Sequence, residues 1–319
     1  MSTSDAAFLP RADLAGASIL TLRETPDAVP AVIETARWLK GMPRASWPAL
    51  LAGKPVALIF ERPSTRTRVS FDVGVRHLGG HPLTLNSTDL QMGRGETIRD
   101  TALVLSRMVS AVVLRTGPHA VIDELARHAT VPVINGLTYE HHPCQGLADV
   151  LTISERFPDT RGVRVAYLGD GNNVCVSLMI AGAAMGMDVV AACPEGYRPP
   201  PAVVEWAAAF GAPRGGGARV VDDPREAAVG AHVLYTDTWV SMGDDADRDR
   251  RLRDLGPYQL NEDLASVARP EVVFMHCLPA HHGEEIADGL LYDARSAAWD
   301  QAENRIHAQA ALLAHVLAG

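Results

Sequence analysis

The chain has 319 residues, which is enough for two domains with separate cores. Its formal net charge of −9 argues against a general nucleic-acid-binding surface, and its hydrophobic content of 47% is that of a globular protein rather than a disordered one. The four cysteines show no Cys-x-x-Cys spacing, the first residues do not resemble a secretion signal, and no apolar run reaches membrane-spanning length, so a reduced cytoplasmic setting is expected.

Short apolar runs alternate with amphipathic segments through the first part of the chain, after a helix predicted at residues 27–40. Strands are predicted at 55–60, 83–86, 111–115 and 131–135, and helices from 65 to 78, 97 to 108 and 120 to 128. This alternation is typical of a parallel sheet covered by helices.

A second alternating series follows a long helix predicted at 143–156 and a linker at 159–162. Its predicted strands are 163–169, 188–192, 219–221, 233–235 and 272–275, and its helices are 173–185 and 202–210. The charged stretch 244–253 is predicted to be a mobile loop. We therefore expect an α/β protein with two domains, residues 1–150 and 151–301, each a mainly parallel, doubly wound sheet flanked by helices. A final helix at about 302–319 is expected to return to the first domain.

The segment Ser64-Thr-Arg-Thr-Arg68 lies where the first strand turns into a helix. Such a turn offers free backbone N–H groups and the positive end of the helix dipole. Two arginines in a first helical turn oppose that dipole by about 0.3–1 kcal/mol each, unless an anion is bound there. Three hydroxyls and two arginines in five residues favour a phosphate or carboxylate site over an ordinary Ser/Thr cap.

Other polar groups follow predicted strands at their carboxyl ends, where ligands gather in parallel sheets. Arg115 ends one strand, and His142-Pro-Cys-Gln145 opens a helix with proline at its first position. Asn173 opens another helix, and Arg305 is placed in the first turn of the final helix. On local grounds alone, a solvated arginine and a capping histidine remain alternatives.

The stretch Asp237-Thr-Trp-Val-Ser241-Met242-Gly243 follows another strand, and its carboxylate is suited to an ammonium group; a plain polar loop is the alternative. The next strand ends in His276-Cys277-Leu278-Pro279. Because neighbouring strand residues face opposite sides, His276 is not expected to activate Cys277 as in a cysteine protease. A small buried hydrophobe is the alternative for this cysteine.

These four motifs, in this order, resemble those of the aspartate/ornithine carbamoyltransferase family, and the last two resemble its ornithine branch. The similarity extends from about Leu14 to the C-terminus. One departure is His282, where relatives commonly carry Arg or Lys.

The resemblance implies a role for each matched position. Carbamoyl phosphate would be held by Ser64, Thr65, Arg66, Thr67, Gln91, Arg115, His142, Gln145 and Arg305. Ornithine would be held by Asn173, Asp237, Ser241, Met242, Cys277 and Leu278. Arg115, His142, Asp237 and Cys277 would be catalytic, and Gln91 would reach a neighbouring subunit of a homotrimer.

The implied activity is transfer of a carbamoyl group to the δ-amine of ornithine in arginine metabolism, with no metal, nucleotide or redox cofactor and no nucleic-acid or membrane partner. The sequence leaves the direction of the reaction open. Carbamoyltransferases for putrescine or N-acetylornithine are alternatives within the class. Gly169-Asp-Gly171 suggests an NAD-dependent dehydrogenase as another alternative, but position 174 is Val174 rather than the third glycine. The acidic residue expected near position 190 is also missing, since residues 189–193 are Val-Val-Ala-Ala-Cys. A non-catalytic binding protein is the third alternative.

Overall fold

A computed structural model gives the structure of the chain. It describes residues 11–86, 90–91, 95–240 and 247–317. The chain divides into two compact units, one formed by residues 1–138 together with 306–319 and the other by residues 139–305. Each unit contains its own sheet.

The first unit is built on a four-stranded sheet in the order β2-β1-β3-β4, and every neighbouring pair is parallel. Its strands are β1 (Pro55–Phe60), β2 (His81–Asn86), β3 (Ala111–Arg115) and β4 (Val133–Leu137). Its helices are α1 (Val29–Lys40), α2 (Thr65–His77), α3 (Ile98–Leu105) and α4 (His119–His128), with short 3-10 turns at Pro26–Ala28 and Arg44–Ser46.

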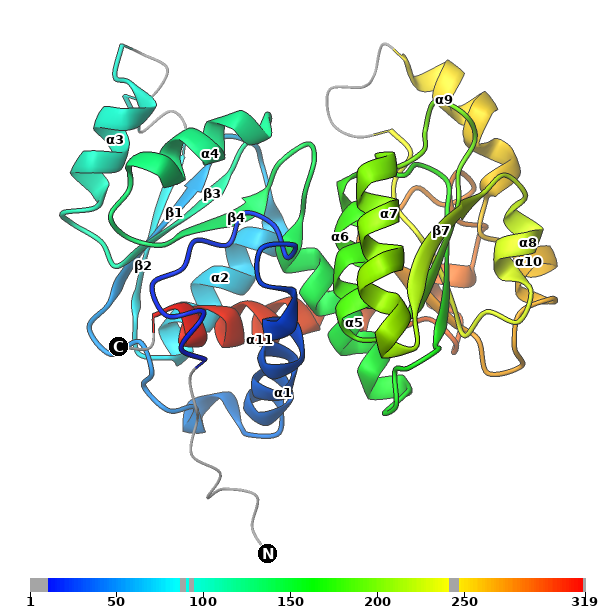
Figure 1. Ribbon diagram of the computed structural model, residues 1–319, viewed down its shortest axis with the longest axis horizontal. Helices are drawn as coiled ribbons and strands as arrows, with labels where there is room; N and C mark the ends of the chain where they lie inside the picture. Colours follow the sequence, from blue (N-terminus) through cyan, green and yellow to red (C-terminus); the bar gives the residue numbers. More distant parts are fainter. Residues whose placement is uncertain (1–10, 87–89, 92–94, 241–246, 318–319) are drawn as a thin grey trace, which may run out of the picture. The chain divides into compact units, whose positions relative to one another are not determined.

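Helices cover both faces of this sheet (Figure 1). On one face, α3 and α4 pack on alternate strand residues such as Ile59 and Leu114, which are fully buried with Ile122 of α4. On the other face lies α2, and the end of α11 (Ala298–Val316) packs against it where an ideal Cβ on Gly74 is 3.4 Å from that of Ala310. The final helix therefore returns to the first unit, as expected.

The second unit contains a five-stranded parallel sheet in the order β7-β6-β5-β8-β9. Its strands are β5 (Arg164–Leu168), β6 (Asp188–Ala192), β7 (Gly217–Val221), β8 (Val233–Thr236) and β9 (Val273–His276). Its helices are α5 (Pro143–Arg156), α6 (Asn173–Ala184), α7 (Pro201–Gly211), α8 (Pro224–Ala228), α9 (Arg248–Leu255) and α10 (Glu262–Ala265), with 3-10 turns at Ala212–Arg214, Gly256–Tyr258 and Leu290–Tyr292.

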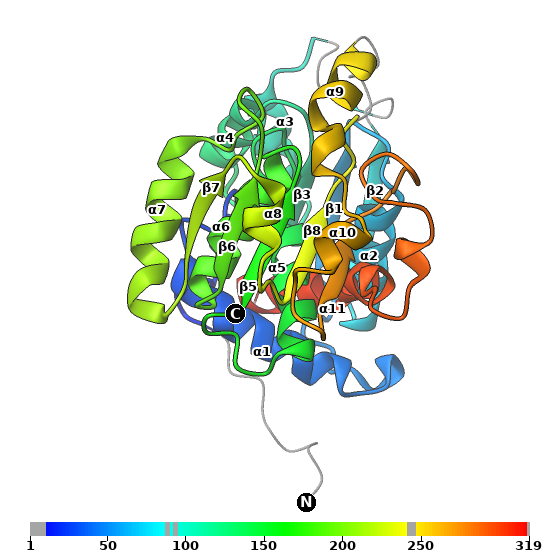
Figure 2. The same ribbon diagram turned by 90° about the vertical axis from the view of Figure 1, so that its right-hand side faces the viewer.

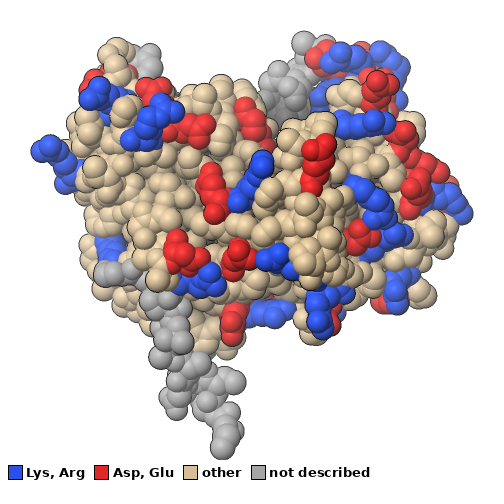
Figure 3. Space-filling view, in the orientation of Figure 1, with Lys and Arg blue, Asp and Glu red and all other residues tan. Residues whose placement is uncertain are grey.

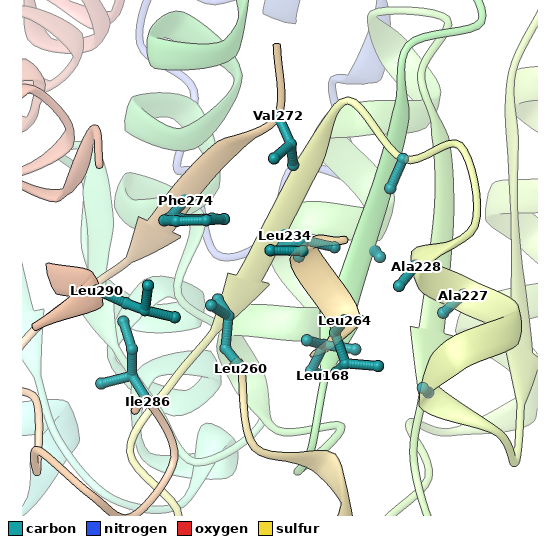
Figure 4. Close-up of a cluster of buried hydrophobic side chains, with 14 of the residues drawn as sticks. Leu168, Ala227, Ala228, Leu234, Leu260, Leu264, Val272, Phe274, Ile286 and Leu290 are labelled. Atoms are coloured by element: carbon teal, nitrogen blue, oxygen red, sulfur yellow. The ribbon is translucent and has the colours of Figure 1, made fainter. Parts of the chain in front are cut away.

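Short helices α8 and α10 cover one face of this sheet (Figure 2). Their buried side chains meet those of the strands in one apolar cluster, in which Leu234 and Phe274 lie near Leu260 and Leu264 (Figure 4). The opposite face is covered by α5, α6 and α7. Helix α6 is almost wholly buried, so its sequence is apolar on all sides rather than amphipathic.

The predicted fold class, two α/β domains with parallel sheets flanked by helices, is confirmed. The predicted loop at 244–253 was wrong in part, because Arg248–Leu255 forms α9. Helices α8 and α10 were not predicted, because they are too short to show a helical period in the sequence. The two compact units divide after Thr138. The expected boundary between functional domains at position 150 stays a prediction.

Basic and acidic side chains are intermixed on the face shown in Figure 3, where α9 carries both signs. Among the described helices, none combines the length and apolar content that crossing a membrane requires.

Candidate active site

The Ser64–Arg68 turn has the predicted geometry. Ser64 is the N-cap of α2, and its side chain accepts a hydrogen bond from the Thr67 backbone N–H over 3.3 Å. Thr67 is buried, and its hydroxyl accepts a hydrogen bond from Nη1 of Arg115 over 3.4 Å. The carboxyl end of β3 and the first turn of α2 therefore present donors to one place, as an oxyanion requires.

The two arginines of this turn differ in their contacts. Arg68 donates to Oδ1 of Asn86 over 2.5 Å and lies 5.5 Å from the centre of the Phe60 ring. Within the part of the chain that the structure describes, the half-buried Arg66 guanidinium has no hydrogen bond or ion pair. A cation at a helix N-terminus without an anionic partner is unfavourable, so Arg66 is the arginine that a bound anion would stabilise.

Of four other predicted positions, two are exposed and two fall outside the described residues. Gln91 lies on an exposed segment beyond β2, and Thr65 is an exposed residue of the first turn of α2. Ser241 and Met242 lie outside the described residues.

A second group of predicted residues gathers at the start of α5. His142 is the N-cap, with Pro143 at the first helical position as expected, and its backbone N–H donates to the Ser177 hydroxyl over 2.8 Å. Gln145, one turn on, is buried, and its Oε1 accepts a hydrogen bond from Nη1 of Arg305 over 2.6 Å. The structure thus brings Gln145 and Arg305 together, although 160 residues separate them.

The predicted setting of Arg305 was wrong. Helix α11 begins at Ala298, four residues before the predicted start, so Arg305 is its eighth residue rather than part of its first turn. The side chain is buried and contacts Gln145. The Arg305 guanidinium is therefore hydrogen-bonded to Gln145 of α5. It lies beyond the first turn of α11, so the helix dipole does not oppose it.

Asp237 and Cys277 follow the neighbouring strands β8 and β9. The Cys277 thiol donates a hydrogen bond to Oδ1 of Asp237 over 2.7 Å, and Nδ2 of Asn172 donates to Oδ2 over 2.7 Å. Asn172 also caps α6 by accepting from the backbone N–H groups of Val174 and Cys175. The carboxylate is thereby fixed at the carboxyl edge of the sheet, where it can receive an ammonium group.

The turn after Cys277 is held by a buried hydrogen bond between His276 and Glu285. Nε2 of His276 lies 3.0 Å from Oε1 of Glu285, and Nδ1 accepts from the Leu278 backbone N–H over 2.9 Å. This contact requires the proton on Nε2, which then donates to Glu285. Leu278 has a φ of 61°, a conformation that a leucine keeps only where its surroundings impose it. Both ring nitrogens of His276 are thus hydrogen-bonded to groups other than the Cys277 thiol.

Three residues that contact this site were missed as site residues: Asp149, Gln301 and Glu285. Asp149 lies one turn beyond Gln145 on α5, so its helical spacing from Gln145 is a sequence signal that could have identified it. Asn173, a predicted ornithine ligand, is the first residue of α6 and is half-buried. Gln301 and Glu285 lie far from their partners in sequence and gave no local signal.

The geometry of the Gly169–Gly171 turn opposes a dinucleotide site. An ideal Cβ on Gly171 would lie 2.4 Å from Cδ of Pro199 and 2.7 Å from the Tyr197 carbonyl oxygen. The space beside this glycine is therefore filled by the protein itself, whereas a dinucleotide fold uses its glycines to let a pyrophosphate approach. Asp170 is also engaged, in an ion pair with Arg251.

Two clusters have the spacing of metal ligands, Asp237–His276–Cys277 and His281–Glu284–Glu285. Both nitrogens of His276 and the thiol of Cys277 are already hydrogen-bonded to protein groups. In the second cluster, Glu284 pairs with Arg248 and Glu285 with His276. We assign no metal to either cluster, because the side chains named above already make hydrogen bonds or ion pairs with other protein groups.

Comparison with known proteins gives matches over nearly the whole chain. The family model described as "Aspartate/ornithine carbamoyltransferase, carbamoyl-P binding domain" matches residues 18–155. The model described as "Aspartate/ornithine carbamoyltransferase, Asp/Orn binding domain" matches residues 161–316.

Two similar proteins are both named as ornithine carbamoyltransferases. The chain is 51% identical over 308 residues to "Ornithine carbamoyltransferase, anabolic" of Pyrococcus furiosus, covering 96% of this chain and 98% of that protein. It is 52% identical over 293 residues to the ornithine carbamoyltransferase of Acidothermus cellulolyticus, covering 92% and 94%.

Solved structures agree with these matches. The ornithine carbamoyltransferase from Pyrococcus furiosus superimposes with a TM-score of 0.92 at 50% identity, over 98% of this chain and 99% of that one. The enzyme from Thermus thermophilus gives a TM-score of 0.84 at 41% identity, over 94% and 98%.

Proposed function

Because this chain belongs to the aspartate/ornithine carbamoyltransferase family, we propose that it is an ornithine carbamoyltransferase. It transfers the carbamoyl group of carbamoyl phosphate to the δ-amine of L-ornithine, giving L-citrulline and phosphate. The observation that carries this assignment is the Asp237 carboxylate, held by Cys277 and Asn172 at the ends of adjacent strands. The relative named as anabolic favours the direction toward citrulline in arginine biosynthesis.

The amine must be neutral to attack the carbamoyl carbon. An ornithine δ-ammonium has a lysine-like pKa of about 10.4, so deprotonation at pH 7 costs about 4–5 kcal/mol. Asp237 and Cys277 position the ammonium group and assist loss of its proton. The nitrogen then forms a bond to the carbonyl carbon, and the bond from that carbon to the bridging oxygen breaks, leaving its electron pair on phosphate.

Hydrogen-bond donors stabilise the negative charge that develops on the carbonyl oxygen and on the departing phosphate. Arg115, Thr67 and His142 act on the carbonyl oxygen, and each donor in such a role typically contributes about 2.7–4 kcal/mol. The departing phosphate is held by the α2 N-terminus and Arg66. Its remaining contacts come from Ser64, Thr65, Gln91, Gln145 and Arg305. The α-amino and α-carboxylate groups of ornithine are held by Asn173, Asp237, Ser241 and Met242, and Leu278 flanks the δ-amine with Cys277.

We propose the domain roles that follow from these contacts, with residues 1–150 and the final helix binding carbamoyl phosphate and residues 151–301 binding ornithine. A homotrimer is proposed because the first unit exposes apolar side chains on its edge strand β2 and on α2: Leu83 is 46% exposed and Val69 is 50% exposed. A cytoplasmic location is proposed because all four cysteines are free thiols.

The decisive experiment measures initial rates of carbamoyl transfer from carbamoyl phosphate. L-Ornithine, putrescine and N-acetylornithine are compared at equal concentrations, with citrulline detected as the product from ornithine. We expect ornithine to be preferred at least about tenfold, which corresponds to about 1.4 kcal/mol in the transition state. A preference for putrescine or N-acetylornithine would mean that ornithine is not the substrate. Absence of transfer to all three amines would overturn the proposed function.

A further inference from the structure

Asp149 is a fully buried carboxyl group that the proposed reaction does not use. It lies on α5, one turn beyond Gln145, and its side chain is 0% exposed. Its Oδ1 accepts hydrogen bonds from Nε2 of Gln145 over 2.8 Å and from Nε2 of Gln301 over 2.7 Å, and its Oδ2 accepts one from the Tyr235 hydroxyl over 3.1 Å. Three donors thus converge on one carboxyl group.

One arm of this network leads to the residues proposed for carbamoyl phosphate. Because Nε2 of Gln145 donates to Asp149, the orientation of the amide is fixed and its Oε1 faces Arg305. Oε1 then accepts from Nη1 of Arg305 over 2.6 Å. Asp149 therefore sets the orientation of Gln145 and, through it, the position of the Arg305 guanidinium.

The other arm leads to the residues proposed for ornithine. Gln301 donates to Asp149 and also to the Tyr235 hydroxyl over 2.8 Å, while its Oε1 accepts from the backbone N–H of His276 over 3.0 Å. This N–H belongs to the last residue of β9, immediately before Cys277. Gln301 thus connects Asp149 to the backbone that carries the thiol.

Burying a carboxyl group costs free energy even when it is hydrogen-bonded, and an apolar residue would pack between α5 and the sheet without that cost. A carboxyl group at this position differs from an apolar one in that a single Oδ1 atom holds both glutamines. Removal of the carboxyl would leave two buried amide donors without their acceptor. The contact atoms point to a role in holding two parts of the site together.

We propose that Asp149 is a positioning residue that couples the binding of carbamoyl phosphate to the binding of ornithine. This inference rests on the proposed function. Occupation of the Gln145–Arg305 arm favours one arrangement of the network, and the same arrangement fixes the strand end at Cys277. Each substrate then raises the affinity for the other by the same factor, as linkage requires.

The test measures the affinity of L-norvaline, which is ornithine without its terminal amine, by calorimetry. The titration is made with and without saturating phosphonoacetamide, in which a methylene group replaces the bridging oxygen of carbamoyl phosphate. We expect phosphonoacetamide to tighten norvaline binding about 5- to 150-fold in the wild type. Asp149→Ala should reduce this factor to about 1, whereas Asp149→Asn keeps an oxygen for both glutamines and should retain most of it.

Thr152→Val is the matched control. Thr152 is also buried on α5, and its hydroxyl accepts a hydrogen bond from Asn304 of α11 over 2.9 Å, yet it lies outside the network. Its coupling factor should equal that of the wild type. If Asp149→Ala does not fold, Gln301→Ala decides, because it removes the connection to His276 and leaves Gln145 bound to Asp149.

Four outcomes would overturn the inference: a wild type without coupling, a folded Asp149→Ala with wild-type coupling, a Gln301→Ala that keeps it, or an equal loss in Thr152→Val. The citrulline assay on the wild type separates this failure from failure of the function. Citrulline formation with unchanged coupling in the variants rejects only the role of Asp149.

Discussion

Cys277 donates its thiol hydrogen to Asp237 across the ends of two adjacent parallel strands. The register of β8 and β9 pairs Thr236 with His276, so the next residue of each strand faces the other at the carboxyl edge of the sheet. Strand pairing, rather than proximity in sequence, therefore creates this contact between residues 40 positions apart. The carboxylate keeps one oxygen on the thiol and the other on Asn172, and an ammonium group can approach both.

Replacement of Asp237 by alanine should impair the use of ornithine. Asp237 is 8% exposed, and loss of one partner from such a charge pair costs about 2–5 kcal/mol, which is about 30-fold or more in binding. We expect the KM for ornithine to rise by at least that factor, while the Kd for carbamoyl phosphate stays within about threefold. Asp254→Ala, on an exposed part of the same unit, is the control. A normal ornithine KM in Asp237→Ala would contradict the assignment.

The sequence predicted the fold well because each strand is a compact apolar run. The predicted bounds of Pro55–Phe60, Ala111–Arg115 and Asp188–Ala192 agree with β1, β3 and β6. Errors occurred where tertiary contacts decide the structure. The start of α11 was misplaced, and β4 begins and ends two residues further along the chain than predicted.

The candidate site was predictable where one segment carries both the backbone geometry and the side chains. Ser64 as a helix cap is the example. The contact of Gln145 with Arg305 and that of His276 with Glu285 were not predictable, because each forms only when separate elements pack together. Local spacing contains no information about such pairs.

Arg66→Ala should weaken the binding of carbamoyl phosphate and leave the fold intact. A charge-assisted hydrogen bond to phosphate contributes about 1.5–3 kcal/mol, so its loss corresponds to a 10- to 150-fold rise in Kd, approximately. Arg76→Ala is the matched control, since Arg76 is an exposed arginine of the same helix that is paired with Asp72. Calorimetry with phosphonoacetamide should separate the two variants. Equal affinities would rule out Arg66 as a phosphate ligand.

The rate of citrulline formation should rise with pH. Only the neutral δ-amine attacks, and its reference pKa of about 10.4 lies far above neutrality, so each pH unit increases the reactive fraction about tenfold. We expect kcat/KM for ornithine to increase between pH 6 and 9, measured at saturating carbamoyl phosphate. A flat profile over that range would contradict attack by a free amine.

Asp149 should make the stability of the protein depend on pH in a defined direction. Burial raises the pKa of its carboxyl group from 3.8 to about 7, although hydrogen bonds from Gln145, Gln301 and Tyr235 and the charge of Arg305 act in the opposite direction. Between about pH 4 and 7 the folded protein holds a proton that the unfolded chain has lost, so wild-type stability falls as the pH rises through this range. Above about pH 7 the carboxyl group is ionised in both states, so its contribution to the free energy of unfolding no longer changes with pH.

Asp149→Asn removes that titration. The free energy of unfolding of the variant minus that of the wild type should therefore increase by about 2–3 kcal/mol from pH 5 to pH 8. Urea denaturation of both proteins at the two pH values measures this difference. In the control Asp159→Asn, the lost carboxyl group has its pKa lowered to about 2 by Arg161, so the difference should not change over that range. An unchanged difference for Asp149→Asn would show that its carboxyl does not titrate there.

Gly171→Ala should destabilise the protein, because the new methyl group would lie 2.4 Å from Cδ of Pro199 and 2.5 Å from its nitrogen. Forcing a methyl group into filled space costs about 1–3 kcal/mol. Gly41→Ala is the matched control, since the atoms nearest to its Cβ position are two backbone oxygens at 3.5 Å, an ordinary contact distance, and its φ is −69°. We expect chemical denaturation to give Gly41→Ala a stability at or slightly above that of the wild type, as the loss of backbone freedom in the unfolded chain predicts. A wild-type stability for Gly171→Ala would mean that the Pro199 loop yields at little cost and that the turn at Gly171 has room for a ligand after all.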